Sequence, residues 1–247
     1  MRTRVSFVIA GIDATAAEVV PLVVGRWREL VFDDDGVVLV DGERREGLAV
    51  EAGAHPRAGT RYSLVTVGER AANYDVELVE DTASRFVVRV EQHGDVPIEF
   101  ELTKPAERAA VRFAGEVGGK WPIGGRVRGD ASVDLRRLPA GDGEPQVLIS
   151  VEHSRVVGDA KAFVRGIDGG WRVDVDVRLR GSGITRVVLG PVIMIMGRRA
   201  VGEVVDKIAA DLNAAVLSAG TPLDAVKVAD RVARGFLDSV ARYRIRT

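Results

Sequence analysis

The stretch Arg172-Val-Asp-Val-Asp-Val-Arg-Leu-Arg180 alternates apolar residues with charged ones from end to end. Successive side chains of a β-strand point to opposite faces, so this pattern predicts a strand with one dry face and one wet face. Such strands are typical of antiparallel sheets, in which one face packs on a core and the other meets water. The stretch therefore predicts an antiparallel sheet in this chain of 247 residues.

The same alternation recurs upstream, with turn signals about every 10–12 residues, as in a meander of neighbouring strands. The predicted strands centre on residues 4–10, 38–40, 48–50, 62–67, 74–78, 86–90, 98–102, 111–113, 133–135 and 147–151. Residues 106–113 fit either a helix or a strand. Strands on both sides of the Pro139–Pro145 loop look alike, which favours one continuous sheet.

A helix is predicted after the first strand. Thr15-Ala-Ala-Glu18 is a capping box, in which the threonine oxygen and the glutamate side chain each satisfy a free backbone N–H. Pro21 follows after the first turn and removes a backbone donor. We therefore expect a kink, or two short helices, within residues 16–30.

Downstream of the quoted stretch the hydrophobic period changes from that of a strand to that of a helix. Gly190-Pro191 suits a helix start, and apolar residues at helical spacing predict one long helix over about 191–217. Thr221-Pro222 begins a second helix, expected to end near residue 243. The predicted class is α+β, with one domain over 1–220 and an additional C-terminal helix over 221–247.

This order resembles the START-like helix-grip superfamily (SRPBCC), which includes polyketide cyclases and proteins like the G-type subunit of carbon monoxide dehydrogenase. The most specific stretch runs from Val175 to Val216, through Arg180-Gly-Ser-Gly183, Leu189-Gly-Pro191 and Gly197-Arg-Arg-Ala-Val-Gly-Glu-Val-Val-Asp-Lys-Ile208. The resemblance implies a curved antiparallel sheet wrapped around a long C-terminal helix, with an apolar cavity between them. The chain has more candidate strands than a usual member, and the last helix is extra.

Composition excludes several classes of function. The chain has no cysteine, which removes disulfides, cysteine nucleophiles and thiolate metal sites. A formal net charge of −1 gives no overall basic field for nucleic acid. The N-terminus lacks the apolar core of a signal peptide, and the apolar run Val187–Met196 is too short to span a bilayer. We expect a cytoplasmic bacterial protein with no cofactor and no transmembrane segment.

Few residues suggest catalysis. His153 lies on a predicted strand with inward parity, and Tyr74 is a second weak candidate for an acid or base. The alternative for His153 is a strand-end histidine with an ordinary partner. Asp174 and Asp176 share a strand face, but the valines between them claim the interior, so the two acids are expected to face water. No group of residues has metal-ligand spacing.

A ligand cavity is the more concrete expectation. Val192-Ile-Met-Ile-Met196 is apolar on every side of its predicted helix, which fits a cavity wall, a partner contact or ordinary core packing. The residues expected around the cavity are Trp121, Phe100, Phe163, Trp171, Met194 and Met196.

Three functions remain open from the sequence. The first is binding or carrying of an apolar small molecule or lipid, and the second is a cyclase- or hydrolase-type enzyme using the same cavity. The third is an assembly factor acting through residues 221–247, whose basic excess would also suit transient contact with a membrane surface or a protein. The sequence indicates no oligomeric state.

Overall fold

One antiparallel sheet of 13 strands dominates the computed structural model, which describes residues 2–10, 15–67, 72–92, 95–117, 125–138, 141–154, 156–181, 210 and 224–241. The strands are β1 (Arg2–Ala10), β2 (Val31–Phe32), β3 (Val37–Val40), β4 (Glu43–Ala52), β5 (Thr60–Val65), β6 (Asn73–Asp81), β7 (Arg85–Gln92), β8 (Ile98–Thr103), β9 (Arg108–Val117), β10 (Gly125–Asp134), β11 (Val147–His153), β12 (Val156–Ile167) and β13 (Gly170–Gly181). The helices described are α1 (Ala16–Arg28), α4 (Ala225–Ser239) and the short 3-10 helix η1 (Leu135–Arg137).

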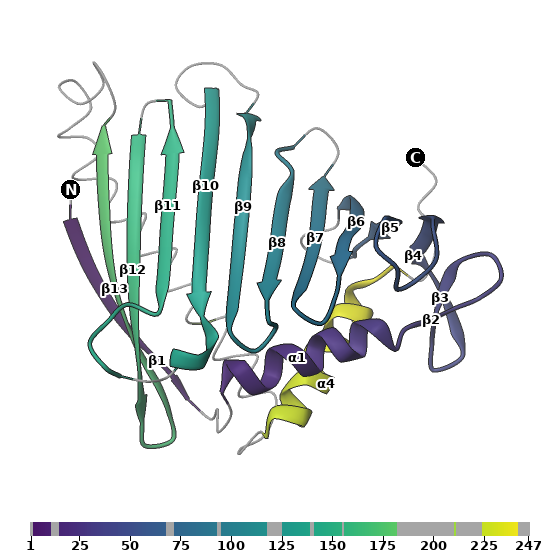
Figure 1. Ribbon diagram of the computed structural model, residues 1–247, viewed down its shortest axis with the longest axis horizontal. Coiled ribbons are helices and arrows are strands. Elements are labelled where there is room, and N and C mark those ends of the chain that lie inside the picture. The colour runs from purple at the N-terminus through teal and green to yellow at the C-terminus, as the bar shows by residue number, and fades with distance from the viewer. Residues whose placement is uncertain are drawn as a thin grey trace.

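The strand order is β1-β13-β12-β11-β10-β9-β8-β7-β6-β5-β4-β3-β2. From β2 onward each strand pairs with the next one in sequence, whereas β1 pairs with the last strand, β13, at the far edge (Figure 1). Helix α1 carries the chain from that edge to β2 at the other. This α+β architecture is consistent with the helix-grip-like arrangement expected from the sequence. The long helix predicted over 191–217 lies outside the described residues, apart from Ala210.

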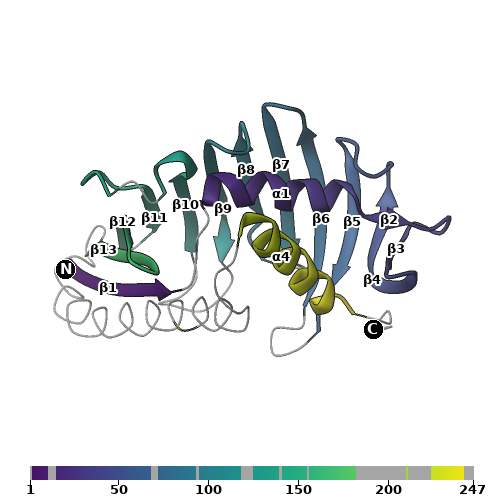
Figure 2. The same ribbon diagram turned by 90° about the horizontal axis from the view of Figure 1, so that it is seen from below.

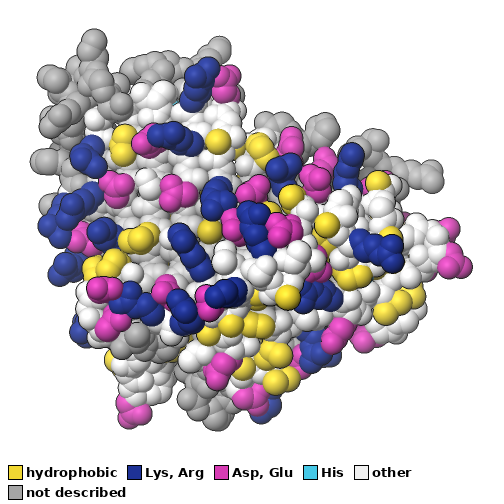
Figure 3. Space-filling view, in the orientation of Figure 1, with side chains coloured by type: hydrophobic (Ala, Val, Ile, Leu, Met, Phe, Trp, Pro, Cys, Tyr) yellow, Lys and Arg dark blue, Asp and Glu magenta, His cyan; other side chains and the backbone are white. Residues whose placement is uncertain are grey.

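The two faces of the sheet differ in chemistry. Charged side chains of opposite sign alternate across the outer face, and Figure 3 shows Lys and Arg interspersed there with Asp and Glu. One row of directly paired residues crosses ten strands: Arg61, Glu77, Arg89, Glu99, Arg112, Asp130, Ser150, Asp159, Arg178 and Arg2. The outer face thus meets water, as the sequence alternation predicts.

The inner face carries two separate hydrophobic clusters. Figure 2 shows the sheet as an arc with α1 and α4 on its concave side. Cluster one is built from Ile9, Leu135, Leu138, Val164 and Val173 at the β1–β13–β12 end. Cluster two contains Val38, Leu48, Tyr62, Val76, Leu78 and Val240 at the β3–β6 end. The start of α1 packs on the first cluster and Trp27, near its end, on the second, so α1 joins the two.

Helix α1 is one helix, not two. The predicted capping box is present: the Thr15 oxygen accepts from the Glu18 backbone N–H at 3.3 Å, and the Thr15 backbone N–H donates to Glu18 at 2.9 Å. Pro21 lies inside the helix without splitting it, so the expectation of two short helices was wrong. A proline here removes only one intrahelical hydrogen bond, and packing of α1 on both clusters compensates for that loss.

The chain after α4 is built into the sheet. Helix α4 begins at Ala225, with Asp224 as its N-cap, three residues later than the Pro222 start that the sequence predicts. Beyond the helix, the Gly47 N–H of β4 donates to the Ala241 carbonyl at 2.9 Å, and the Ala241 N–H donates to the Val65 carbonyl of β5 at 2.9 Å. Val240 and Ala241 are buried, and they lie between β4 and β5 at the end where these two strands no longer pair with each other. The division into 1–220 and 221–247 remains a prediction.

Several strands differ from the sequence-based expectation. Of residues 106–113, left open between helix and strand, 108–113 belong to strand β9 and the first two lie in the turn before it. Strand β12 was not predicted, because its inward positions are small (Gly158, Ala160, Ala162) while Val157 and Phe163 lie on the outer face. The charged stretch that decided the fold is confirmed as the centre of β13.

Candidate functional site

An apolar cavity of about 340 Å³ lies between the inner face of strands β4–β7 and the helices α1 and α4. Its floor is formed by Leu48, Leu64, Val76, Phe86, Val88 and Val90. Its roof is formed by Val23, Val24, Arg26, Trp27 and Leu30, in and just after α1, and by Val232, Ala233, Phe236 and Leu237 of α4. Cavities of this size and character are typical of small-molecule sites.

The periodicity of each element explains this lining. On the strands, inward positions recur at every second residue, so Phe86, Val88 and Val90 of β7 all face the cavity. On α1, Val23 and Trp27 are separated by one helical turn and lie on one face. On α4, Ala233, Phe236 and Leu237 share a face for the same reason, and the small side chain of Ala233 leaves room beneath the helix.

An aromatic group adjoins the cavity on the side of Trp27. The Trp27 ring meets Tyr62, His55 and Phe236 edge-on, with centroid distances of 5.2, 5.6 and 6.3 Å. Phe32 lies 4.7 Å from the His55 ring. Edge-to-face contacts in this range hold rings in fixed orientations. Two rings of this group, Trp27 and Phe236, line the cavity.

His55 and Tyr62 form a partly buried hydrogen-bonded pair. The distance from His55 Nδ1 to the Tyr62 hydroxyl oxygen is 2.9 Å. Burial lowers the pKa of His55, and burial raises the pKa of Tyr62 to about 12. Both groups are therefore uncharged at neutral pH, and neither appears in the lining of the cavity.

One residue of the cavity wall, Trp27, has a polar atom that does not face the cavity and has no partner among the described residues. The indole nitrogen of Trp27 is buried, and no hydrogen-bond acceptor reaches it within the described part of the chain. Leaving such a donor unpaired costs about 1–3 kcal/mol, so an orphaned buried group calls for a physical explanation.

The rim of the cavity carries one charged side chain, Arg26. Its Nε donates to Asp230 of α4 at 2.7 Å, and its Nη1 donates to Glu29 at 2.9 Å. The Arg26–Asp230 pair links the two roof helices. Because both side chains are about half exposed, water screens the attraction and the link is weak.

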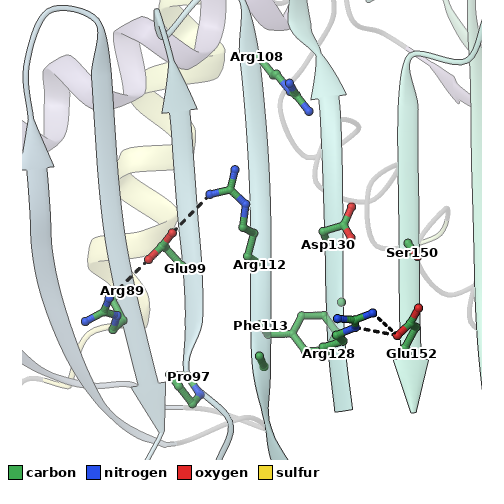
Figure 4. Close-up of a pocket in the computed structure, with 12 residues that line it drawn as sticks. Arg89, Pro97, Glu99, Arg108, Arg112, Phe113, Arg128, Asp130, Ser150 and Glu152 are labelled. Carbon is green, nitrogen blue, oxygen red and sulfur yellow. Dashed lines mark hydrogen bonds and ion pairs between the residues drawn. The ribbon is translucent and has the colours of Figure 1, made fainter. Parts of the chain in front are cut away.

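A second hollow, of about 740 Å³, lies on the outer face over β7–β11 (Figure 4). Its arginines are largely engaged: Glu99 lies between Arg89 at 3.5 Å and Arg112 at 3.6 Å, and Arg128 binds Glu152 at 2.6 Å. Cross-strand ion pairs of this kind stabilise a solvated sheet. The hollow is open, and its four arginines share their lining with three carboxylates, so the apolar cavity is the better candidate site.

The predicted cavity residues are dispersed in the structure. Phe100 lies on the inner face of β8, opposite Val88 of the cavity floor, and is 44% exposed. Phe163 pairs with Asp174 and lies on the outer face, and Trp171 packs on cluster one at the other end of the sheet. Trp121, Met194 and Met196 lie outside the described residues. Phe100, Phe163 and Trp171 do not line the cavity.

The weak catalytic candidates also lie apart. His153 ends β11, opposite Val127 and Val156, whereas Tyr74 lies on β6 and packs on cluster two. Asp174 and Asp176 are on the outer face as expected, but Asp176 is buried, contrary to the expectation that both acids face water. Asp176 binds Arg2, and Asp174 binds Arg165 at 2.6 Å. In the described ranges, no three His, Asp or Glu residues lie close enough to hold a metal ion.

Sequence reasoning missed Trp27, His55 and Tyr62 as a group. His55 stands in a loop that looks merely Gly-rich, and only the β4–β5 hairpin brings it to Tyr62. The inward parity of Tyr62 with Leu64 was a usable signal.

Within the described residues, no helix is both long and apolar enough to cross a bilayer.

No protein-family model matches the chain, and no curated protein matches it. Two solved structures show a distant likeness. The di-domain ARO/CYC StfQ from the steffimycin biosynthetic pathway is 9% identical, with a TM-score of 0.26 over 94% of this chain and 99% of that one. DynU16, from the dynemicin biosynthetic locus, is 12% identical, with a TM-score of 0.20 over 96% and 97%. TM-scores this low establish no shared function, so function is argued from the cavity.

Proposed function

We propose that this protein binds an apolar small molecule in the cavity between strands β4–β7 and helices α1 and α4. The observation that carries the proposal is the cavity itself: a half-open space of about 340 Å³, bounded by two helices and a sheet, and lined by apolar side chains except at Arg26. A concave apolar surface that stays open to its surroundings commonly marks a binding site.

The volume limits the size of the ligand. At about 30 Å³ per water-sized atom group, the cavity holds on the order of a dozen non-hydrogen atoms. A bicyclic hydrocarbon or a medium-length alkyl chain fits this limit, whereas a whole membrane phospholipid does not. The proposal therefore favours a small apolar molecule, or the end of a longer chain that enters between the helices.

Binding is favoured over catalysis by the chemistry of the lining. A cyclase or hydrolase needs an acid, base or nucleophile within hydrogen-bond reach of the reacting atoms. Among the described lining residues the one ionisable group is Arg26, which is held by Asp230 and Glu29. His55 and Tyr62 pack edge-on against Trp27 and do not line the cavity. An enzymatic role stays the second hypothesis.

The test is to titrate the protein with naphthalene, whose bicyclic skeleton matches the cavity in size. Binding is measured by the change in tryptophan fluorescence. For an apolar ligand of this size we expect a Kd on the order of 10–100 μM. Ala233→Phe places a ring in the cavity and should weaken binding at least tenfold.

Val226→Phe is the matched control, because Val226 lies on the same helix but is 50% exposed and does not line the cavity. It should bind naphthalene like the unaltered protein. Thermal melting of both variants shows whether the fold is kept. No binding to the unaltered protein, or equal binding to a folded Ala233→Phe variant, would overturn the proposal.

A further inference from the structure

The walls of the apolar cavity offer a ligand no hydrogen-bonding partner among the described residues. Nearly all of the surface that they present is carbon. Arg26 is the one ionisable residue of the described lining, and its guanidinium donates to Asp230 and Glu29. What Arg26 turns to the cavity is therefore its methylene stem. The cavity can attract a ligand only through burial of apolar surface.

A polar atom of a ligand loses its hydrogen bonds to water when it enters such a space. The described walls do not replace them, and one unpaired buried polar group weakens binding about tenfold or more. Water inside the cavity does not compensate, because a buried water molecule needs at least two polar partners to stay ordered. The part of the ligand that enters the cavity is therefore hydrocarbon.

Val232 of α4 marks the opening of the cavity. It lines the cavity and yet is 50% exposed, whereas the other described lining residues are buried or half-buried. Because the cavity is half-open, a molecule seated in it can keep one end in water beside this valine. A polar group at that end keeps its hydration and avoids the cost of burial.

We propose that the ligand of this cavity is polar at one end only. A hydrocarbon portion of about eight to ten carbon atoms fills the cavity, and the polar group stays in water at the opening beside Val232. The inference rests on the proposed function and specifies its ligand class. It excludes molecules that carry oxygen atoms along their whole length, because these would bury unpaired acceptors.

Two isomeric alcohols test where a polar group is tolerated. 1-Octanol carries its hydroxyl at the end of the chain and 4-octanol carries it in the middle, so 4-octanol must either bury the hydroxyl or leave half of its chain outside. We expect 1-octanol to bind about tenfold more tightly, as measured by displacement of naphthalene. Equal affinities for the two alcohols would overturn the inference, while binding of naphthalene would leave the proposed function intact.

A thiol placed at the opening locates the polar end directly. The chain has no cysteine, so Val232→Cys introduces a single thiol. Octyl methanethiosulfonate carries its thiol-reactive group at the end of an octyl chain, so binding of the chain should deliver that group to the new thiol. We expect it to react at least about tenfold faster than methyl methanethiosulfonate, through proximity. An excess of 1-octanol should abolish the difference.

Val226→Cys is the matched control, because Val226 lies on the same helix and is also 50% exposed but does not line the cavity. At this position the two reagents should react at similar rates, and thermal melting of both variants shows whether the fold is kept. A faster reaction of the octyl reagent at both positions, or at neither, would overturn the inference, because the reactive end would then not be held beside Val232. If naphthalene also fails to bind the unaltered protein, it is the proposed function that fails.

Discussion

Glu101 on the outer face of β8 shows how strongly one residue of the charged network is held. Its carboxylate accepts from Arg85 Nε at 3.0 Å and from Arg112 Nη1 at 2.6 Å, and its side chain is 11% exposed. The hydrogen bond from Arg85, aided by Arg112, lowers the pKa of Glu101 from 4.5 to about 2. The folded state therefore favours the ionised carboxylate.

This shift makes a prediction about acid stability. Because the pKa of Glu101 is depressed on folding, its stabilising contribution is complete above pH 4.5 and is lost as the pH falls towards about 2. Glu101→Gln should lower the free energy of unfolding by about 1–2 kcal/mol at pH 7, a figure reduced because both arginines are half exposed. Urea unfolding at pH 7 and pH 3.5 should show the gap between variant and unaltered protein narrowing at the lower pH.

Glu116→Gln is the control for this measurement. Glu116 also faces an arginine, Arg126, but both side chains are more than three quarters exposed. Its removal should change stability by less than about 0.5 kcal/mol at either pH. A loss as large as that of Glu101→Gln would mean that burial of the carboxylate is not what matters.

Individual residues were predictable from the sequence where the cause is local. The capping box of Thr15 and Glu18 depends on residues three apart, and the outward direction of Asp174 and Asp176 depends on strand parity. The pairing of His55 with Tyr62 depends on a loop conformation that no local pattern encodes.

At the scale of elements, the contact between β4 and the chain after α4 is made possible by Gly47. A Cβ at this position would lie 2.6 Å from the Ala241 backbone nitrogen and 2.7 Å from the Val65 carbonyl oxygen. Both are backbone atoms held by hydrogen bonds, so they cannot move aside cheaply. This close approach joins α4 to the sheet.

Two glycine substitutions test this arrangement. Gly47→Ala should lower the free energy of unfolding by about 2–3 kcal/mol, because the added methyl group forces the backbones of Ala241 and Val65 away from β4. Gly235→Ala, at an exposed site of α4 with nothing near its Cβ, should raise it by about 0.5–1 kcal/mol through helix propensity. Chemical denaturation measures both. Amide exchange at Ala241 should accelerate in the first variant only.

The prediction of elements was limited where packing departs from an ordinary hydrophobic pattern. Strand β12 was not detected in the sequence because Gly158, Ala160 and Ala162 face inward. Residues this small do not produce the alternation of large apolar and polar side chains that identifies a strand. Pro21 suggested a break in α1 that packing on two clusters prevents. The strongly alternating strands were identified correctly, since their pattern reflects burial directly.

At the scale of the whole molecule, the two clusters of the inner face share no buried residue. The sequence pattern predicted the meander in which neighbouring strands pair from β2 to β13, but it did not predict the pairing of β1 with β13. The resemblance to helix-grip proteins implied the curved antiparallel sheet but fewer strands. The separation of the clusters raises the question of whether the two ends of the sheet unfold together.

We expect them to respond separately to a local loss of packing. Leu78→Ala removes a fully buried side chain of cluster two and should cost about 2–5 kcal/mol in the free energy of local unfolding. Native-state hydrogen exchange should show faster exchange across β5–β7, with β12 and β13 unchanged. Leu135→Ala in cluster one should give the reverse result. An equal loss of protection at both ends in each variant would show that the sheet opens as one unit.

The pairing of β1 with β13 constrains the order in which the protein completes its fold during synthesis. Arg2 binds Asp176, 174 residues later, so the first strand must wait unpaired until most of the chain has left the ribosome. The backbone groups of β4 and β5 that pair with Ala241 stay without this partner for longer still. At a translation rate of about 5–20 residues per second, this interval lasts on the order of ten seconds or more. During that time the unpaired edge strand and the apolar inner face of the sheet, not yet covered by α4, are exposed. Nascent chains of this protein are therefore expected to depend on chaperones that shield unpaired strands until translation passes residue 241.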